Sequence, residues 1–463
     1  MYIRPLLIKH TFPPEVLYSL TVETALLFLP QIQFNSHYIA GQSLGKMAAS
    51  TMVLDSQNQA VPVTPINVTR MLEACSTGDM ETVQQLVQQN PVYASQQDER
   101  TGQSPLMVAS AVGNLPLVKF LLEAGAPWNA VDRQGKCAGN YAIDAEKYDV
   151  SNLLVEWGTQ CELILGAAQR SQRQGELSDG SSSDHNDQQL KLPESHQSST
   201  KPDYLSQPLR YSDDGKTLLD AQKDAVMMQW EEPLMKAHAE IMMTDNQSYK
   251  KRVLNVGFGL GIIDNALQEY GPSLHVIIEA HPQVYQHMLA QKWDQKENVR
   301  ICFGRWQEVT KQLVAEGLQF DAIFFDTYAE HIMDMEDFHQ TMIRMLSKPN
   351  GIYSFFNGLA PDNIFFHGVA CQCIKLQLQQ LGLDSEFLPC QIQVNEKVWD
   401  GVRRKYWHGR DTYYLPRVTW NPQALHGTIV AEEHEGKNKA SPSKQDNDIM
   451  EMEVEAKRPR ING

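Results

Sequence analysis

The stretch Leu254-Asn255-Val256-Gly257-Phe258-Gly259-Leu260-Gly261-Ile262-Ile263-Asp264 decides the fold of this 463-residue chain. An apolar run leads into a glycine-rich loop and then into helix-forming residues, which is the strand–loop–helix unit of α/β proteins. Glycines suit such a loop because a side chain there would keep the backbone away from a ligand. Glu279 stands 22 residues after Gly257, at the end of the next apolar run, where a carboxylate can accept both hydroxyls of a ribose. We therefore predict a nucleoside cofactor at this loop.

Outward from this loop, short apolar runs alternate with helical stretches through the rest of the second half of the chain. The runs that predict strands are Arg252–Val256, His275–Ile278, Ala322–Phe325 and Ile352–Phe356, and Lys405–Trp407 with Thr412–Leu415 suggest a closing β-hairpin. Such alternation is typical of an α/β, Rossmann-like sheet with helices on both faces.

The spacing of the glycines favours S-adenosylmethionine over a dinucleotide as the cofactor. A pyrophosphate-binding loop usually reads GxGxxG, whereas Gly261 is followed here by Ile262 and Ile263. S-adenosylmethionine has no phosphate to hold, so a GxGxG loop suits it. Arg305-Trp306 begins a helix after the following strand, and Trp306 either offers its ring to the adenine or is a core aromatic between helix and sheet.

Two acids indicate what the cofactor would act on. Asp326 follows the Ala322–Phe325 strand, and Glu231 precedes Pro233, which should begin or break a helix. Two carboxylates match the planar donor fork of a guanidinium. Since a guanidinium, with a pKa above about 12, has no free lone pair, one carboxylate must take a proton as the methyl group moves. The alternative is that Asp326 caps a helix and Glu231 is a surface charge.

The first half of the chain contains an internal repeat. Gly102 and Gly135 are 33 residues apart, as are Ala109 and Ala142, which is the period of ankyrin repeats. We predict an all-α module of two to three repeats over 66–168, although the copy after Gly135 is degraded to Cys137-Ala138-Gly139-Asn140. Such a module either binds a protein partner or packs onto the catalytic domain.

The remaining segments have compositions that cannot bury a core. Residues 1–65 lack periodicity and should be poorly ordered, with a true start possibly at Met47. Residues 169–202 predict a flexible linker, 203–428 the catalytic domain and 429–463 a disordered charged tail. The tail ends in Lys457-Arg458-Pro459-Arg460, which is either a weak nuclear-import patch or a solvated end. We expect a cytoplasmic and nuclear protein.

Composition excludes several other classes. The formal net charge is −16 and no dense basic stripe is visible, so we expect no direct nucleic-acid binding and favour cationic partners. The seven cysteines lack paired CxxC spacing, so we expect free thiols and no metal. Apolar runs are far shorter than the roughly 20 residues that cross a bilayer, so we expect no membrane span.

Five motifs in order carry a resemblance to a known family. They are Trp230-Glu231-Glu232-Pro233-Leu234-Met235, Val256-Gly257-Phe258-Gly259, Ile277-Ile278-Glu279, Gly304-Arg305-Trp306 and Asp326-Thr327-Tyr328. The segment from about 204 to 420 resembles guanidinoacetate methyltransferase. Together with the ankyrin module, it is similar to the fungal and plant type IV protein arginine methyltransferases.

This resemblance implies a class I methyltransferase sheet and an S-adenosylmethionine-dependent enzyme that methylates the internal δ-nitrogen of arginine in proteins. It implies that Glu231 and Asp326 hold the guanidinium. It implies a cofactor site lined by Tyr211, Met227, Met235, Gly257, Phe258, Gly259, Leu260, Gly261, Ile262, Glu279, Ala280, His281, Arg305, Trp306 and Asp326. The paired-glutamate and Thr-His-Trp loops of other protein arginine methyltransferases have no counterpart in the sequence, and Tyr406-Trp407-His408-Gly409 is a poor substitute. A small-molecule guanidino methyltransferase and a catalytically silent ankyrin scaffold are the two alternatives.

Overall fold

The computed structural model describes residues 65–178, 201, 203–244, 248–328, 332–407 and 411–424. The predictions for 1–64, for most of the linker and for the charged tail lie outside these residues.

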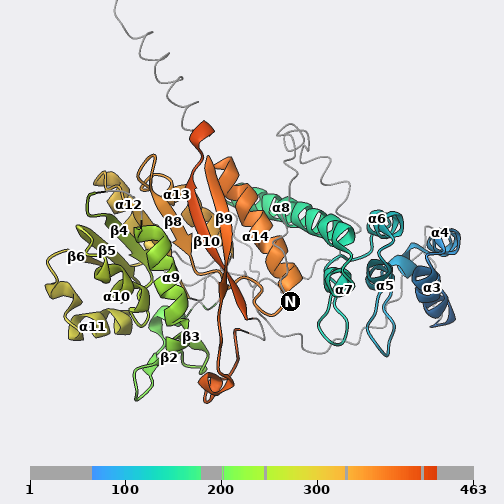
Figure 1. The fold of residues 1–463 in the computed structure, drawn as a ribbon, viewed down its shortest axis with the longest axis horizontal. Coiled ribbons are helices and arrows are strands. Elements are labelled where there is room, and N and C mark those ends of the chain that lie inside the picture. Colours follow the sequence, from blue (N-terminus) through green and yellow to red (C-terminus); the bar gives the residue numbers. More distant parts are fainter. Residues whose placement is uncertain are drawn as a thin grey trace, which may run out of the picture.

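The N-terminal module consists of three pairs of helices, as the 33-residue period predicts (Figure 1). The pairs are α3 (Pro65–Thr77) with α4 (Met80–Gln89), α5 (Pro105–Val112) with α6 (Leu115–Glu123), and α7 (Ala138–Asp144) with α8 (Tyr148–Ser178). Short polar side chains begin α4, α5 and α6, because their oxygens accept hydrogen bonds from the first free backbone N–H groups. Asp79 accepts from Thr82 N, Ser104 from Met107 N and Asn114 from Leu117 N.

Helix α8 is longer than an ankyrin helix needs to be, and it is helical through 169–178, where the composition predicted a linker. This part of α8 has partners that a free linker would lack. Helix α8 packs along α14 (Ile364–Gln380), and Arg170 forms an ion pair with Glu336 of α13 at 2.6 Å. The ion pair of Arg170 therefore ties the first turn of the predicted linker to α13, where composition alone predicted no contact.

The second half forms a seven-stranded sheet in the order β6-β5-β4-β7-β8-β10-β9. Its strands are β4 (Arg252–Val256), β5 (Leu274–Glu279), β6 (Val299–Phe303), β7 (Ala322–Phe325), β8 (Ile352–Phe355), β9 (Leu383–Gln391) and β10 (Thr412–Trp420). Strands β4 to β8 pair in parallel, and β10 pairs antiparallel with both β8 and β9. The four predicted parallel strands are confirmed.

Helices cover both faces of this sheet, as the alternation of the sequence predicts (Figure 1). One face carries α9 (Glu232–Met243), α10 (Ile262–Glu269) and α11 (Pro282–Ala290), and the other carries α12 (Trp306–Ala315), α13 (Ile332–Met342) and α14. Successive strand residues serve opposite faces: Val253 packs with the α9–α10 core and Leu254 with the α12–α14 core.

The predicted closing hairpin is half wrong. Strand β10 exists, but its hairpin partner is β9, paired from Leu383–Trp420 to Gln391–Thr412. Residues 405–407 form no strand; instead, Trp407 is buried against Trp230 and the core around it. Aromatic residues are enriched in strands, so this run predicted one. Here the aromatic rings pack in the core, and the backbone forms no strand pairing.

A smaller three-stranded antiparallel sheet precedes α9 and was not predicted. It consists of β1 (Arg210–Tyr211), β2 (Thr217–Leu219) and β3 (Ala225–Met228), and the single turn η4 (Gln229–Glu231) joins it to α9. The strand order of the main sheet reverses between β4 and β7, the place where α/β proteins usually bind ligands. Gly257 follows β4 and Asp326 follows β7 at this reversal.

The ankyrin module packs directly onto the catalytic domain. One hydrophobic core contains residues of both, and the ring of Trp128 contacts Phe365 and Phe366 of α14 edge-on at centroid distances of 6.3 and 5.8 Å. A Cβ atom at Gly139 would lie 1.9 Å from the Phe365 ring. Helix α7 thus departs from the ankyrin signature at the position where it contacts the Phe365 ring. The prediction that the ankyrin module packs onto the second domain is confirmed.

In the part of the chain that the structure describes, no helix combines the length and apolar character needed to cross a bilayer. All seven cysteines are free thiols, as expected.

Candidate active site

The glycine loop and the strand tip that carries Asp326 are in backbone contact. Gly257 has φ +96°, a conformation that side chains disfavour, and a Cβ atom placed on it would lie 1.9 Å from the Asp326 carbonyl oxygen. The Asp326 N–H donates to Val256 O at 2.9 Å, which holds the two strand ends together. Glycine at 257 therefore lets the predicted cofactor loop and the predicted acceptor acid meet.

Glu279 ends β5, and its carboxylate is buried beside the loop. Its Oε2 accepts from Phe258 N at 3.0 Å and its Oε1 from His281 N at 2.6 Å. Burial raises the pKa of this carboxyl, and the backbone donors oppose the rise. Each carboxylate oxygen has a second lone pair, so both can also accept a ribose hydroxyl.

Tyr211 of β1 supplies an observation that favours a polar ligand. Its hydroxyl is buried and has no hydrogen-bond partner among the described residues. Its ring stacks on His287 at 4.2 Å, and burial, with the Glu279 carboxylate as a second cause, raises the pKa of the phenol. Because a buried polar atom without a partner is costly, this hydroxyl fits a ligand that carries a carboxylate or ammonium group, as S-adenosylmethionine does.

Met227 and Leu260 approach each other at this loop. Met227 Sδ accepts from Leu260 N at 3.2 Å and would lie 2.7 Å from a Cβ atom at Gly259. Gly259 and Gly261 have φ values of +57° and +71°, and Ile262 begins α10 directly after them. The structure thus brings these predicted cofactor residues together.

The side chains of Met235 and Phe258 are packed in the core beside the loop. Met235 is fully buried between α9 and the sheet, and the fully buried Phe258 ring packs edge-on against Trp293 at 5.3 Å. Phe258 contributes its backbone N–H to Glu279 instead. The ring also lies close under the loop backbone, since a Cβ atom at Gly261 would be 2.4 Å from it.

Trp306 lies in the core, which supports the second of its two predicted roles. The ring packs edge-on against Phe325 at 6.0 Å and Phe338 at 5.3 Å, in the layer between α12 and the sheet. Arg305 directly precedes α12 and donates from Nε to Gln307 at 3.2 Å.

Ala280 and His281 form the turn between β5 and α11. His281 accepts from Gln283 N through Nδ1 at 3.2 Å, and its Nε2 lies 3.1 Å from Gln207 O. These bonds give His281 a structural role in holding Glu279 at the site.

The two predicted acceptor acids share one environment. Glu231 ends η4 at the loop–helix junction, as predicted, and its side chain is buried. Burial, and secondarily the Asp326 carboxylate, raise the pKa of Glu231 to about 8. Burial raises the pKa of Asp326 to about 7. A buried Glu231 that interacts with Asp326 rules out the alternative of a surface charge.

The two acids differ in how they are held. Glu231 Oε1 accepts from Met228 N at 2.9 Å and from the Tyr406 hydroxyl at 2.5 Å. Among the described residues no hydrogen bond reaches the Asp326 carboxylate, which is only partly buried. A bound guanidinium would favour the charged forms of both acids and so lower their raised pKa values.

Aromatic rings that the sequence analysis did not assign to the site pack around Trp230, the residue before Glu231. The Trp230 ring lies 5.9 Å from Trp399, 5.7 Å from Tyr406 and 6.2 Å from Trp407. The high density of aromatic residues between 399 and 414 was the sequence feature that could have indicated them. Their assignment needs contacts across 175 residues of sequence, such as that of Tyr406 with Glu231.

A chain of buried hydrogen bonds supports the same site from β8 and β10. The Tyr413 hydroxyl accepts from Asn357 N at 2.7 Å and lies 2.9 Å from His238 Nε2, and His238 Nδ1 lies 2.7 Å from Ser354 Oγ. Burial lowers the pKa of His238 to about 3, so this ring is neutral. Burial raises the pKa of the Tyr413 phenol, and the negative charges of Asp326 and Glu231 add to the rise.

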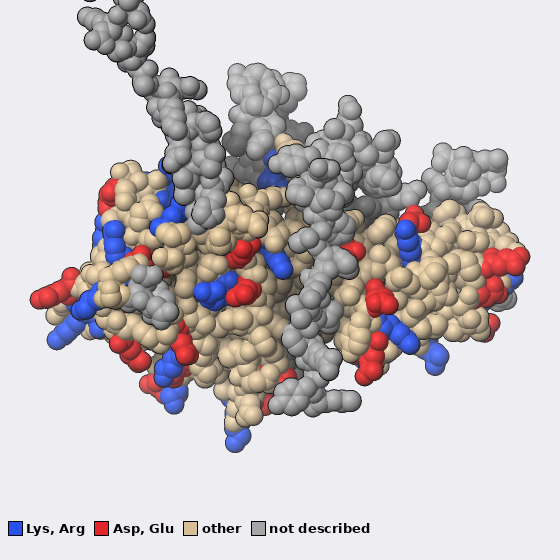
Figure 2. All heavy atoms as spheres, turned by 45° about the horizontal axis from the view of Figure 1, so that its top comes forward, with Lys and Arg blue, Asp and Glu red and all other residues tan. Residues whose placement is uncertain are grey.

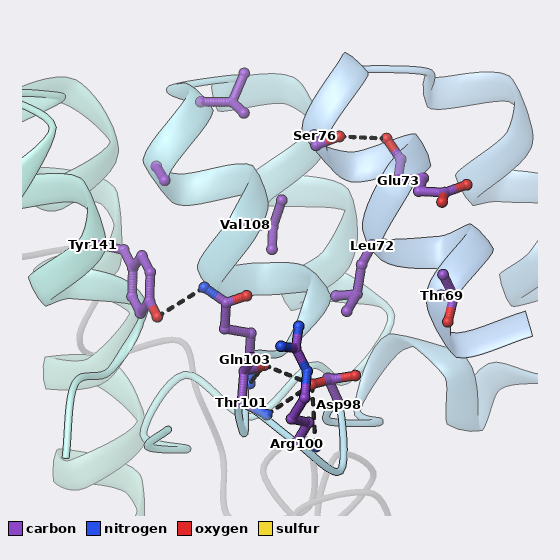
Figure 3. A pocket seen from close by; sticks show the side chains of 12 residues that line it. Thr69, Leu72, Glu73, Ser76, Asp98, Arg100, Thr101, Gln103, Val108 and Tyr141 are labelled. Atoms are coloured by element: carbon purple, nitrogen blue, oxygen red, sulfur yellow. Dashed lines mark hydrogen bonds between the residues drawn. The ribbon is translucent and has the colours of Figure 1, made fainter. Parts of the chain in front are cut away.

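A separate hollow lies on the ankyrin module, with a cavity volume of about 550 Å³ (Figure 3). Helices α3 and α5 and the loop before α5 form its walls, and Gln103 donates to the Tyr141 hydroxyl at 3.0 Å at one side. Glu73, Asp98 and Arg100 line it, so both signs of charge are present. All its lining residues belong to the repeats, which separates it from the two acids.

Charges elsewhere are mixed. Where described residues are visible in Figure 2, acidic and basic side chains are interspersed. Within the described residues, no group of three or more His, Cys, Asp or Glu side chains is arranged to hold a metal ion.

Comparison with known proteins agrees with this geometry. The family model of guanidinoacetate N-methyltransferase matches residues 197–364, and that of ankyrin repeats in three copies matches residues 71–164. Protein arginine N-methyltransferase 2 of Yarrowia lipolytica is 40% identical over 225 residues, which is 47% of this chain and 47% of the relative.

Longer matches cover the ankyrin module as well. The protein of the same name from Neurospora crassa is 30% identical over 427 residues, covering 77% of this chain and 96% of the relative. That of Saccharomyces cerevisiae is 31% identical over 331 residues, covering 66% of this chain and 78% of the relative.

Proposed function

This chain belongs to the protein arginine N-methyltransferase 2 family, and from that premise we propose that it methylates arginine guanidines in proteins with S-adenosylmethionine as donor. The observation that carries the proposal is the backbone contact between Gly257 and Asp326. It joins a glycine loop suited to a nucleoside cofactor to two acids suited to a guanidinium, the buried Glu231 and the partly buried Asp326.

S-adenosylmethionine, when bound, supplies a methyl group on a positively charged sulfur, which leaves as S-adenosylhomocysteine after the transfer. Glu279 would hold the ribose, and the unsatisfied hydroxyl of Tyr211 would bind a polar group of the cofactor. We propose the remaining lining residues, from Met227 through the glycine loop to Arg305, as cofactor contacts made by backbone or side chain.

Glu231 and Asp326 bind the guanidinium and orient one nitrogen toward the methyl group. As the N–C bond forms and the S–C bond breaks, the nitrogen loses its proton to the Asp326 carboxylate, whose pKa of about 7 suits a base near neutral pH. The Asp326 carboxylate is the better acceptor because no hydrogen bond from the described residues occupies it. Bulk water can then take the proton after the products leave.

We propose the internal δ-nitrogen as the methylated atom. The resemblance to type IV enzymes supports this choice, as does a sequence without the paired-glutamate loop that holds the terminal nitrogens in other protein arginine methyltransferases. Fragmentation spectra of a methylated product test it directly. A methyl group on the δ-nitrogen stays with the ornithine fragment, and one on a terminal nitrogen leaves with the guanidine carbon.

A labelling assay separates this proposal from its alternatives. Incubation of the purified chain with cell extract and methyl-labelled S-adenosylmethionine should place the label in acid-precipitated protein. Label found only in acid-soluble products would favour a small-molecule guanidino methyltransferase. Failure to bind S-adenosylmethionine in calorimetry would favour the silent scaffold.

In this proposal the ankyrin module has a structural role and a binding role. It stabilises the catalytic domain through α14, and its hollow along α3 and α5 offers a surface to a protein partner. A cytoplasmic and nuclear location is part of the proposal and can be tested by imaging a tagged chain with and without its last seven residues.

A further inference from the structure

The segment between β9 and β10 reaches back to the acceptor site. It contains η6 (Glu396–Trp399), and its Tyr406 hydroxyl donates to Glu231 Oε1 at 2.5 Å. The Met228 N–H donates to the same oxygen at 2.9 Å. Among the described residues no hydrogen bond reaches Glu231 Oε2, so this oxygen is the one left for a ligand.

We propose that Tyr406 is a positioning residue for arginine methylation, whose hydroxyl fixes the Glu231 carboxylate so that Oε2 faces the acceptor guanidinium. The inference rests on the proposed function, because it takes Glu231 as a guanidinium contact. A glutamate side chain rotates about three bonds, and one donor alone leaves its carboxylate free to turn. Two donors on one oxygen fix both the carboxylate plane and the direction of the second oxygen.

Both donors are held by the same small sheet. Met228 ends β3, and the turn between β2 and β3 holds the segment that carries Tyr406. The Arg403 N–H donates to Lys223 O at 2.9 Å, and the Arg403 guanidinium pairs with Asp224 through Nε at 2.8 Å. Lys201 also binds Asp224 at 3.1 Å, which fixes this carboxylate in turn. Movement of β3 and movement of Tyr406 are therefore coupled.

The hydroxyl of Tyr406 also favours the charged form of Glu231. The titratable groups that interact with Glu231 are Asp326 beyond β7, Tyr413 of β10 and Tyr406, whose hydroxyl is bonded to it. Asp326 repels a second negative charge, whereas a phenol O–H donated to the carboxylate stabilises it. Loss of the hydroxyl would raise the pKa of Glu231 further and weaken guanidinium binding at neutral pH.

Phenylalanine at 406 tests the hydroxyl alone. The ring of Tyr406 contacts Trp230 at 5.7 Å and Trp399 edge-on at 5.1 Å, and these contacts do not need the oxygen. A matched control is Tyr353→Phe. Tyr353 is also fully buried, and its hydroxyl bonds His339 at 3.1 Å, but neither acid acts on it.

The experiment measures methyl transfer to an arginine-containing peptide across pH, together with calorimetric binding of S-adenosylhomocysteine. Tyr406→Phe should lower kcat/KM about 10- to 100-fold at pH 7, as expected for one lost hydrogen bond to a charged group. Its acidic limb should move up by about one pH unit, and S-adenosylhomocysteine binding should be unchanged. Tyr353→Phe should keep the wild-type pH profile. Kinetics of Tyr406→Phe within twofold of wild type, with an unmoved limb, would overturn the inference.

A titration that does not depend on activity separates this inference from the proposed function. Carbon-13 labelled glutamate gives a carboxyl signal for residue 231, assigned by its loss in Glu231→Gln. Tyr406→Phe should raise its titration midpoint, and an unchanged midpoint would overturn the inference even if the enzyme methylates arginine. Conversely, a wild-type chain that methylates no peptide would refute the proposed function, and the titration would still decide the role of Tyr406.

A second variant guards against loss of folding in Tyr406→Phe. Arg403→Gln removes the pair with Asp224 on an exposed side chain, so it leaves the core intact. It should shift the acidic limb in the same direction by a smaller amount. An Arg403→Gln enzyme with the wild-type limb would show that Glu231 does not depend on this segment.

Discussion

Replacement of Gly257 by alanine should separate the cofactor loop from the acceptor acids. The added Cβ atom would lie 1.9 Å from Asp326 O, and ordinary contact begins at 3.4 Å, so one backbone must retreat by about 1.5 Å. The two segments follow β4 and β7, which are central strands of the sheet. The shift must therefore fall on the glycine loop or on the backbone of Asp326. A displacement of about 1 Å in a catalytic site can cost about 100-fold in rate.

Gly271→Ala is the matched control for this experiment. Gly271 also has a positive φ, +60°, but an added Cβ atom there meets nothing within 4 Å. Both variants carry the cost of alanine in a left-handed conformation, about 1 kcal/mol, and only Gly257→Ala carries the clash. Urea unfolding measures the shared cost, and calorimetry and steady-state kinetics measure the rest.

We expect Gly257→Ala to lower kcat/KM for the acceptor at least about 100-fold and to weaken S-adenosylmethionine binding at least about tenfold. Gly271→Ala should stay within about twofold of wild type in both quantities, since it lies at the end of α10 away from the strand tips. If the two variants had the same kinetics, the close approach of Gly257 to Asp326 would not be what brings donor and acceptor together.

Three further changes test other parts of the account. Asp326→Asn should lower kcat about 100-fold or more, because an amide cannot take the proton, while cofactor binding stays within about threefold; unchanged kcat would remove the base. The raised pKa values of Glu231 and Asp326 mean that the folded chain holds protons that the unfolded chain has lost above its own values of about 4. The contribution of these groups to the free energy of unfolding therefore falls as pH rises toward 8, and Glu231→Gln should reduce that fall. If urea unfolding gave wild type and Glu231→Gln the same loss of unfolding free energy between pH 5.5 and 8.5, the prediction would be refuted. Phe365→Ala should lower the free energy of unfolding by about 3 kcal/mol and let the ankyrin helices melt at a lower temperature than the sheet in calorimetry; a single wild-type transition would show that the shared core is unimportant.

Much of the cofactor site was predictable because its signal is local. The strand before Gly257, the loop itself and the acid at Glu279 follow one another within one strand–helix–strand unit, whose geometry is nearly constant in α/β proteins. The same holds for Asp326, whose position could be predicted from its place at the end of the Ala322–Phe325 strand. These positions depend on short-range pattern, and the structure places them as the pattern predicts.

The surroundings of the acceptor were less predictable because they are assembled from distant segments. No spacing rule relates Glu231 to Asp326, 95 residues later, so their pairing was predicted from the chemistry of a guanidinium and from the resemblance. Tyr406 was missed because its partner lies 175 residues away and its own neighbourhood looked like a strand. Similarly, the sequence around Gly139 was interpreted as a degraded repeat. The structure shows that the Phe365 ring occupies the space that a side chain at 139 would need.

A crystal structure with S-adenosylhomocysteine and an arginine-containing peptide would test the central claim most directly. We predict that the peptide guanidinium contacts both Glu231 Oε2 and the Asp326 carboxylate, with its δ-nitrogen nearest the cofactor sulfur. A guanidinium that touches neither acid, or a cofactor bound away from Gly257 and Glu279, would contradict the account.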